Sequence, residues 1–231
     1  PRRRKLRDAS LHAEEAGVAL LRTSWARRSE LLGVTFGDET VQTELVRGGD
    51  RFWSGNWGCQ VSVDDRPVRM QGEWQSICWM SDEDAVYLEL EGKFEGDVTV
   101  QRQLVLARED RFLYLADAVM GPVGRKIDYE GRLPLPADAE VRPADETREL
   151  YLSGCERDFL VLPLALPEWR SEVADGLLER DAEGLRLTQS AADGRLYAPL
   201  FIDLDSRRNS KPFTWRRLTV GERRQILPPS V

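Results

Sequence analysis

Histidine is almost absent from this chain. The 231 residues contain one histidine, His12. A metal site built on two histidines is therefore impossible within the chain, and a Ser-His-Asp or Cys-His catalytic arrangement would have to use His12. That residue lies in a charged N-terminal stretch, which does not favour a catalytic role. The sequence also has no Gly-rich phosphate loop, zinc spacing or nucleotide fingerprint, so it predicts no metal and no cofactor.

Cysteine is also scarce, and the three cysteines, Cys59, Cys78 and Cys155, show no C-x-x-C spacing. An odd number allows one disulfide at most. We expect mostly buried thiols, with Cys59–Cys78 as the one candidate bridge.

Long apolar runs and long amphipathic helices are missing as well. No run approaches the roughly 20 residues of a membrane-spanning helix, and no helical periodicity extends beyond about three turns. The chain opens on Pro1-Arg2-Arg3-Arg4 with no apolar stretch of a signal peptide behind it. Since the chain does not begin with Met, we expect it to be a piece of a longer protein. Since it has no long apolar run, we expect no membrane partner.

Charge is distributed unevenly. The net charge is -7, from 33 basic and 40 acidic residues. Residues 1–7 carry +5 and residues 206–224 carry +6, so the remainder carries -18. Such an acidic body does not suit a polyanion-binding groove, because phosphate or sulfate ligands need basic neutralisation, and no nucleic-acid partner is expected. The two basic ends either bind a polyanion or lie against the acidic body, and the second interpretation is favoured.

The stretch from Asp97 to Val119 is the clearest structural signal. Two β-rich runs flank a polar break at residues 109–110, which predicts a hairpin. If the turn centres there, facing residues have numbers that sum to 219, and Arg102 faces Asp117. Arg102 shares a strand face with apolar residues. An unpaired buried charge is costly, so we predict an Arg102–Asp117 ion pair across the hairpin.

Similar short runs fill the rest of the chain, joined by Gly, Asp and Pro turns. They predict an all-β fold, a large antiparallel β-sandwich. With 41% hydrophobic residues, the chain is long enough to bury a substantial core as one domain. We expect a charged N-terminal segment over residues 1–16 and a single sandwich domain over 17–231. Residues 48–58 are interpreted as a Gly/Trp-rich loop, and 213–220 and 224–227 as the closing strands.

Four tryptophans fall within 27 residues: Trp53, Trp57, Trp74 and Trp79. One hypothesis is a sugar platform, in which flat rings stack on pyranose faces while Asn56, Glu73 and Gln75 bind hydroxyl groups. The other, which we favour, is core packing, because Trp carries a large buried area. As ligand contacts, Trp53 and Trp57 are better candidates than Trp74 and Trp79.

An acidic set follows the tryptophans. Asp82, Glu83 and Asp84 lead into a strand in which Tyr87 and Glu89 share a face. Paired carboxylates are typical of glycoside hydrolysis or of calcium sites. An alternating strand with one solvated face has the same pattern, and this interpretation is favoured.

Two segments resemble the β-sandwich of heparinase II/III-type polysaccharide lyases. Residues 14–25, Glu-Glu-Ala-Gly-Val-Ala-Leu-Leu-Arg-Thr-Ser-Trp, are similar to the opening strand of that sandwich, and the Arg102…Asp117 hairpin is similar to a later strand pair. The resemblance implies a sandwich of the supersandwich type from a carbohydrate-active protein. The family's histidine-rich segment has no counterpart, because no histidine lies between Trp25 and Arg102. Its helical toroid, which carries much of the lyase chemistry, is missing here and would have to lie in an upstream domain.

These observations leave three functional hypotheses. The leading one is a non-catalytic domain of a polysaccharide-lyase-like protein that contacts a polysaccharide through Trp53, Asn56, Trp57, Glu73 and Trp74. The second is a catalytic lyase or hydrolase that uses Asp82, Asp84 or Glu89 with Tyr87 as acid or base. The third is a structural or assembly domain without a ligand.

Overall fold

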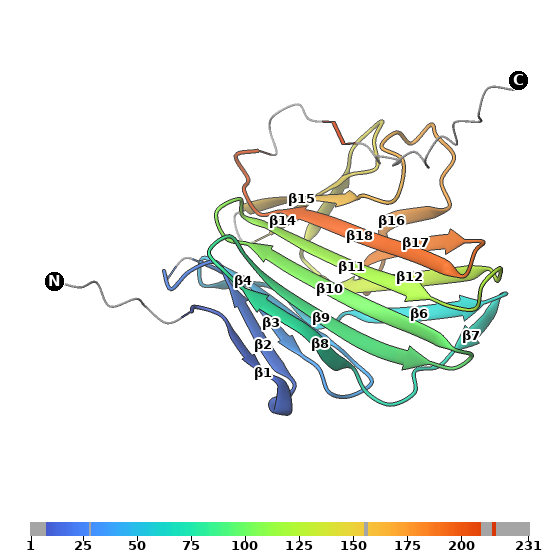
Figure 1. Ribbon diagram of the computed structural model, residues 1–231. Helices are drawn as coiled ribbons and strands as arrows, with labels where there is room; N and C mark the ends of the chain where they lie inside the picture. Colours follow the sequence, from blue (N-terminus) through green and yellow to red (C-terminus); the bar gives the residue numbers. More distant parts are fainter. Residues whose placement is uncertain (1–7, 28, 155–156, 209–213, 216–231) are drawn as a thin grey trace, which may run out of the picture.

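The computed structural model describes residues 8–27, 29–154, 157–208 and 214–215. These residues form three antiparallel sheets that share one hydrophobic core, so the predicted all-β sandwich is confirmed. Figure 1 shows the long strands of the largest sheet side by side, with the two smaller sheets behind them. The one helical element among the described residues is a 3-10 turn, η1 (Glu14–Ala16), and no described helix is long and apolar enough to cross a membrane.

The largest sheet has eight strands, and the predicted hairpin lies within it. In spatial order they are β13 (Glu140–Pro143), β14 (Leu150–Gly154), β15 (Arg157–Pro163), β18 (Arg195–Asp203), β11 (Phe112–Met120), β10 (Val98–Ala107), β9 (Ala85–Phe94) and β8 (Gln75–Ser81). Strands β9, β10 and β11 alternate between buried and partly exposed residues along most of their length. This period of two gives the sheet one face toward the core and one outer face.

Two five-stranded sheets form the opposite layer. The first contains β1 (Leu11–Ala13), β2 (Val18–Arg22), β3 (Glu30–Thr35), β4 (Gln42–Arg47) and β5 (Asp50–Asn56). The second, in spatial order, contains β16 (Gly176–Arg180), β17 (Gly184–Ala191), β12 (Ile127–Pro134), β6 (Gly58–Val63) and β7 (Arg66–Val68). Only Trp57 separates β5 from β6, so the chain passes directly from one of these sheets to the other at that residue.

The prediction of a loop over residues 48–58 is wrong. Only Gly48 and Gly49 form the turn, both with positive φ, and residues 50–56 are strand β5, paired with β4 across a register shift at Leu45/Val46. The glycines in this stretch suggested a loop, but Phe52 and Trp53 are buried in the core and hold the strand in place.

The N-terminal segment expected over residues 1–16 takes part in the sandwich where it is described. Strand β1 pairs with β2, so residues 11–13 extend the first five-stranded sheet. Residues 1–7 and the closing strands expected at 213–220 and 224–227 lie outside the described residues, apart from Thr214 and Trp215, which are not in a strand.

Candidate functional site

The Arg102–Asp117 pair is present at the centre of the eight-stranded sheet. The two residues face each other in the β10–β11 register, and both side chains are 0% exposed. Arg102 donates from Nε to Asp117 Oδ1 at 2.9 Å and from Nη2 to Oδ2 at 2.8 Å. This is the bidentate geometry in which a guanidinium binds a carboxylate most strongly.

Aromatic rings and a carbonyl complete the surroundings of this pair. The guanidinium carbon of Arg102 lies 3.9 Å from the Trp57 ring centroid and 4.7 Å from that of Trp74. Its Nη1 donates to the Trp57 carbonyl oxygen at 2.7 Å, and the Tyr129 hydroxyl donates to Asp117 Oδ2 at 2.7 Å. We call these five residues the arginine box. Cation–π contacts and hydrogen bonds offset the cost of burying the two charges.

The surroundings of the tryptophans support the core-packing interpretation over the sugar platform. Trp53, Trp57 and Trp74 are only 2%, 4% and 2% exposed, so their ring faces are not available for stacking on a sugar. The Trp53 indole donates to Thr43 Oγ1 at 3.2 Å inside the core. Trp57 and Trp74 instead lie against a cation supplied by the protein itself. Asn56 and Glu73, in contrast, are exposed and open to a ligand.

The candidate disulfide is absent, because Cys59 and Cys78 are both free. Cys59 lies close to the arginine box: burial, followed by the Asp117 charge, raises the pKa of its thiol far above the usual value. Burial and the same carboxylate also raise the pKa of the Tyr129 hydroxyl. Cys155 lies outside the described residues.

These shifts predict a loss of stability in alkali. Folding keeps Cys59 and Tyr129 protonated, whereas the unfolded chain ionises them near their usual pKa values of 9.0 and 10.0. The free energy of unfolding should therefore fall from about pH 9 upward. Urea unfolding between pH 7.5 and 10.5 measures this fall, and Cys59→Ala should make it less steep between pH 9 and 10. An equal slope in both proteins would contradict the assignment to Cys59.

Four hollows follow one another around the junction of β5, β6 and the residues that precede β8. The first, about 590 Å³, is lined by Asn56, Trp57 and Trp74 among others. It shares Glu39 with a second of about 590 Å³. The second shares Glu73 with a third of about 530 Å³. The first also shares Asn56 with a fourth of about 330 Å³.

We call the four hollows together the seam groove. Each hollow has the dimensions of a small-molecule site. Neighbouring hollows that share lining residues would offer a linear polymer several adjacent subsites. Of the ligand residues expected from the sequence, the seam groove brings together Asn56, Trp57, Glu73, Trp74 and Gln75, and it leaves out Trp53.

Sequence analysis missed several polar residues of the seam groove. They come from separate loops and strands, so no spacing in the sequence connects them: Asp38, Glu39, Arg69, Gln71, Lys93, Glu130, Arg132 and Glu183. The one available signal was that Glu39, Arg69 and Gln71 flank turns, where polar residues are exposed and reach ligands.

The acidic set expected near residue 82 has mainly a structural role. Asp82 Oδ1 accepts hydrogen bonds from the backbone N–H groups of Asp84 and Ala85, each at 2.9 Å, and so closes the β8–β9 turn. Those bonds lower the pKa of the Asp82 carboxyl, the Ala85 N–H having the largest effect. Burial and a hydrogen bond to Glu89 raise the pKa of the Tyr87 hydroxyl. A phenol that stays protonated at neutral pH is a poor general base.

His12 packs between aromatic rings. Its centroid lies 5.0 Å from that of Trp79 and 6.2 Å from that of Phe36, and Nε2 is buried without a hydrogen-bond partner among the described residues. A catalytic histidine needs a nucleophile on one ring nitrogen and an orienting group on the other. Across the described part of the chain, no group of three or more His, Cys, Asp or Glu side chains is placed to hold a metal ion.

Comparison with solved structures places this architecture among known folds. The chain superposes on a heparan sulfate lyase, HepC, from Pedobacter heparinus with a TM-score of 0.62 at 10% sequence identity. The match covers 87% of this chain and 37% of the lyase. The chain has the fold of one domain of a heparinase-type lyase.

Two further structures of heparinase III give the same result. Their TM-scores are 0.59 and 0.58 at 12% and 11% identity, with 86% of this chain covered in both and 36% and 37% of theirs. The chain thus spans just over a third of the heparinase-type lyases it matches. No protein-family model and no curated protein matches the sequence.

Proposed function

We propose that this chain is a domain of a polysaccharide-lyase-like protein that is non-catalytic on its own and contacts a polysaccharide along the seam groove. The observation that carries the proposal is the seam groove itself, four neighbouring hollows that share lining residues on a fold shared with heparinase-type lyases. An extended groove of this kind follows a polymer over several sugar units.

The polar groups of the seam groove supply the contacts in this proposal. Asn56 is exposed where two hollows meet, and Glu73 where two others meet. An amide both donates and accepts hydrogen bonds, and a carboxylate accepts several, which suits sugar hydroxyl groups. Trp57 and Trp74 form the wall behind them, held by the arginine box. A wall that is rigid before binding limits the entropy lost on binding.

The candidate acid and base groups are not placed for catalysis. Tyr87 keeps its proton at neutral pH, Asp82 is engaged in a turn, and His12 is stacked between rings. Elimination by a lyase needs a base that accepts a proton from the sugar carbon. Within the described residues none of these three groups is free to act as one, and we assign such a base to a further domain.

The test is a titration with hexasaccharides, both neutral and derived from heparan sulfate, followed by tryptophan fluorescence. Trp57 and Trp74 line the first hollow, so occupation of the seam groove should change their emission. The double variant Asn56→Ala/Glu73→Ala should weaken binding by about 10-fold or more, since each lost hydrogen bond contributes about 1 kcal/mol.

Glu140→Ala is the matched control, because Glu140 is an exposed glutamate on β13, away from the seam groove. It should bind like the wild type. The proposal would be overturned if no saccharide bound. It would also be overturned if the double variant bound every saccharide with the same affinity as the wild type.

A further inference from the structure

The outer face of the eight-stranded sheet carries a hydrogen-bonded lattice that spans four neighbouring strands. The Tyr114 and Tyr197 hydroxyl groups lie 2.8 Å apart, and Tyr197 also donates to Gln103 Oε1 at 2.8 Å. Gln103 Nε2 donates to Glu89 Oε1 at 3.3 Å, and Glu89 in turn bonds to Tyr87. We call these five residues the tyrosine lattice.

The tyrosine lattice is formed in advance and remains accessible. Between its two linked tyrosines, Ala116 and Pro199 face each other in the β11–β18 register, and their short side chains leave room for the phenols to meet above the sheet. Tyr197 is 40% exposed. Burial raises the pKa values of the Tyr87 and Tyr197 hydroxyl groups, which therefore remain hydrogen-bond donors throughout the physiological pH range.

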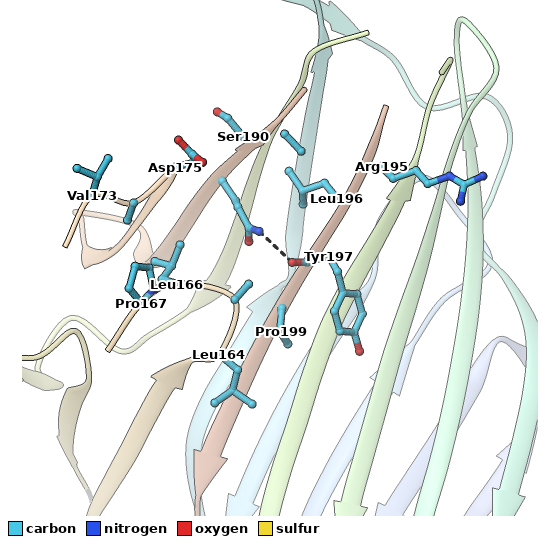
Figure 2. Close-up of a pocket in the computed structure, with 14 residues that line it drawn as sticks. Leu164, Leu166, Pro167, Val173, Asp175, Ser190, Arg195, Leu196, Tyr197 and Pro199 are labelled. Atoms are coloured by element: carbon cyan, nitrogen blue, oxygen red, sulfur yellow. Dashed lines mark hydrogen bonds between the residues drawn. The ribbon is translucent and has the colours of Figure 1, made fainter. Parts of the chain in front are cut away.

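An open groove adjoins the tyrosine lattice and shares Tyr197 with it. Its volume is about 700 Å³, within the usual range for ligand sites. Figure 2 shows Tyr197 at the border of this groove, with Leu166, Pro167 and Val173 across from it. Asp175, in the same segment as Val173, adds a carboxylate to the lining. Apolar walls with a few polar groups, beside exposed aromatic rings, form the kind of surface that binds the two faces of a sugar ring.

The charges of this surface favour an uncharged ligand, because the carboxylates of Glu89, Glu91 and Asp175 outnumber the Arg195 guanidinium in the groove lining. Glu89 and Glu91 face outward on β9, and each accepts a hydrogen bond from a glutamine amide. Among the described residues neither carboxylate has an ion-pair partner within 4 Å, and Asp175 has none either. A sulfated or uronate chain would approach these carboxylates at a cost, because like charges repel across a partly dehydrated interface.

We propose that the tyrosine lattice and the adjoining groove form a second saccharide-binding surface, distinct from the seam groove and selective for uncharged hexose chains. The hydroxyl groups of such a chain would bond to the Tyr197 hydroxyl, the Gln103 amide and Glu89, with sugar rings against the tyrosine rings.

The experiment is calorimetric titration of the chain with three neutral hexasaccharides (N-acetylchito-, cello- and maltohexaose) and with a heparan sulfate hexasaccharide. We expect saturable binding of at least one neutral hexasaccharide. Tyr197→Ala should weaken that binding by about 10-fold or more, and Gln103→Ala by a smaller factor. The heparan sulfate hexasaccharide should show no binding that depends on Tyr197.

Two control variants separate this proposal from the one for the seam groove. Tyr151→Ala removes a tyrosine on β14 of the same sheet but outside the tyrosine lattice, and Asn56→Ala alters only the seam groove; both should retain full affinity for this surface. Tyr197→Phe keeps the ring and removes the hydroxyl group, which provides a milder variant if Tyr197→Ala unfolds.

Three results would overturn the inference. The first is that no neutral hexasaccharide binds. The second is that Tyr197→Ala and Tyr197→Phe both bind the neutral hexasaccharide with the affinity of the wild type. The third is that heparan sulfate binds the wild type and fails to bind these two variants. Binding that depends on Asn56 but not on Tyr197 would refute this surface while supporting the seam groove.

Discussion

Replacing Arg102 with methionine is expected to lower the free energy of unfolding by about 3–5 kcal/mol, because it leaves the Asp117 carboxylate buried without its counter-ion. The hydrogen bond to the Trp57 carbonyl oxygen is lost as well. Urea unfolding followed by circular dichroism measures the change. A cost below about 1 kcal/mol, the range of exposed ion pairs, would contradict the energetic role given to the arginine box.

Two further variants make the Arg102→Met result specific. Arg51→Met removes an arginine whose pair with Glu44 is exposed, and it should cost no more than about 1 kcal/mol. The double variant Arg102→Met/Asp117→Leu should cost less than the sum of its two single changes, because it leaves neither charge unpaired.

The second large effect is expected from Gly131→Ala. Strand β12 places Gly131 where an added Cβ would lie 2.1 Å from the Tyr129 hydroxyl oxygen. The phenol would have to move away from Asp117, so a charge-assisted hydrogen bond would be lost and the core would be overpacked. We expect a cost of about 2–4 kcal/mol. Thermal unfolding measures it.

Gly33→Ala is the matched control for Gly131→Ala. Gly33 is also a strand glycine, but its nearest contact for an added Cβ is Leu20 at 3.7 Å, an ordinary van der Waals distance. That variant should change the free energy of unfolding by about 0.5 kcal/mol or less. Equal costs at the two positions would contradict the steric argument.

Local sequence rules predicted the centre of this fold well. The polar break at residues 109–110 determines the β10–β11 register, and that register alone places Arg102 opposite Asp117. The partners that complete the arginine box could not be predicted in the same way. Trp57, between β5 and β6, lies 45 residues from Arg102, and Tyr129, on β12, lies 12 residues from Asp117. Only the packing of the two layers brings them together.

The tryptophans show why composition alone left two roles open. Ring stacking on a sugar and ring stacking on an arginine require the same residue type, and the sequence does not say which partner is nearer. Arg102, predicted to be buried, was itself the missing signal, because a buried guanidinium favours aromatic neighbours. The tyrosine lattice had no local signal, since Gln103, Tyr114 and Tyr197 come from three different strands.

The most direct test of the account is one hexasaccharide titration read by tryptophan fluorescence and by ultraviolet absorbance in the same cuvette. Elimination by a lyase creates an unsaturated sugar that absorbs ultraviolet light, whereas binding alone changes only the emission of tryptophans such as Trp57 and Trp74. A non-catalytic domain that contacts saccharide predicts a saturable fluorescence change with constant absorbance. A steady rise in absorbance, or fluorescence that no saccharide changes, would contradict it.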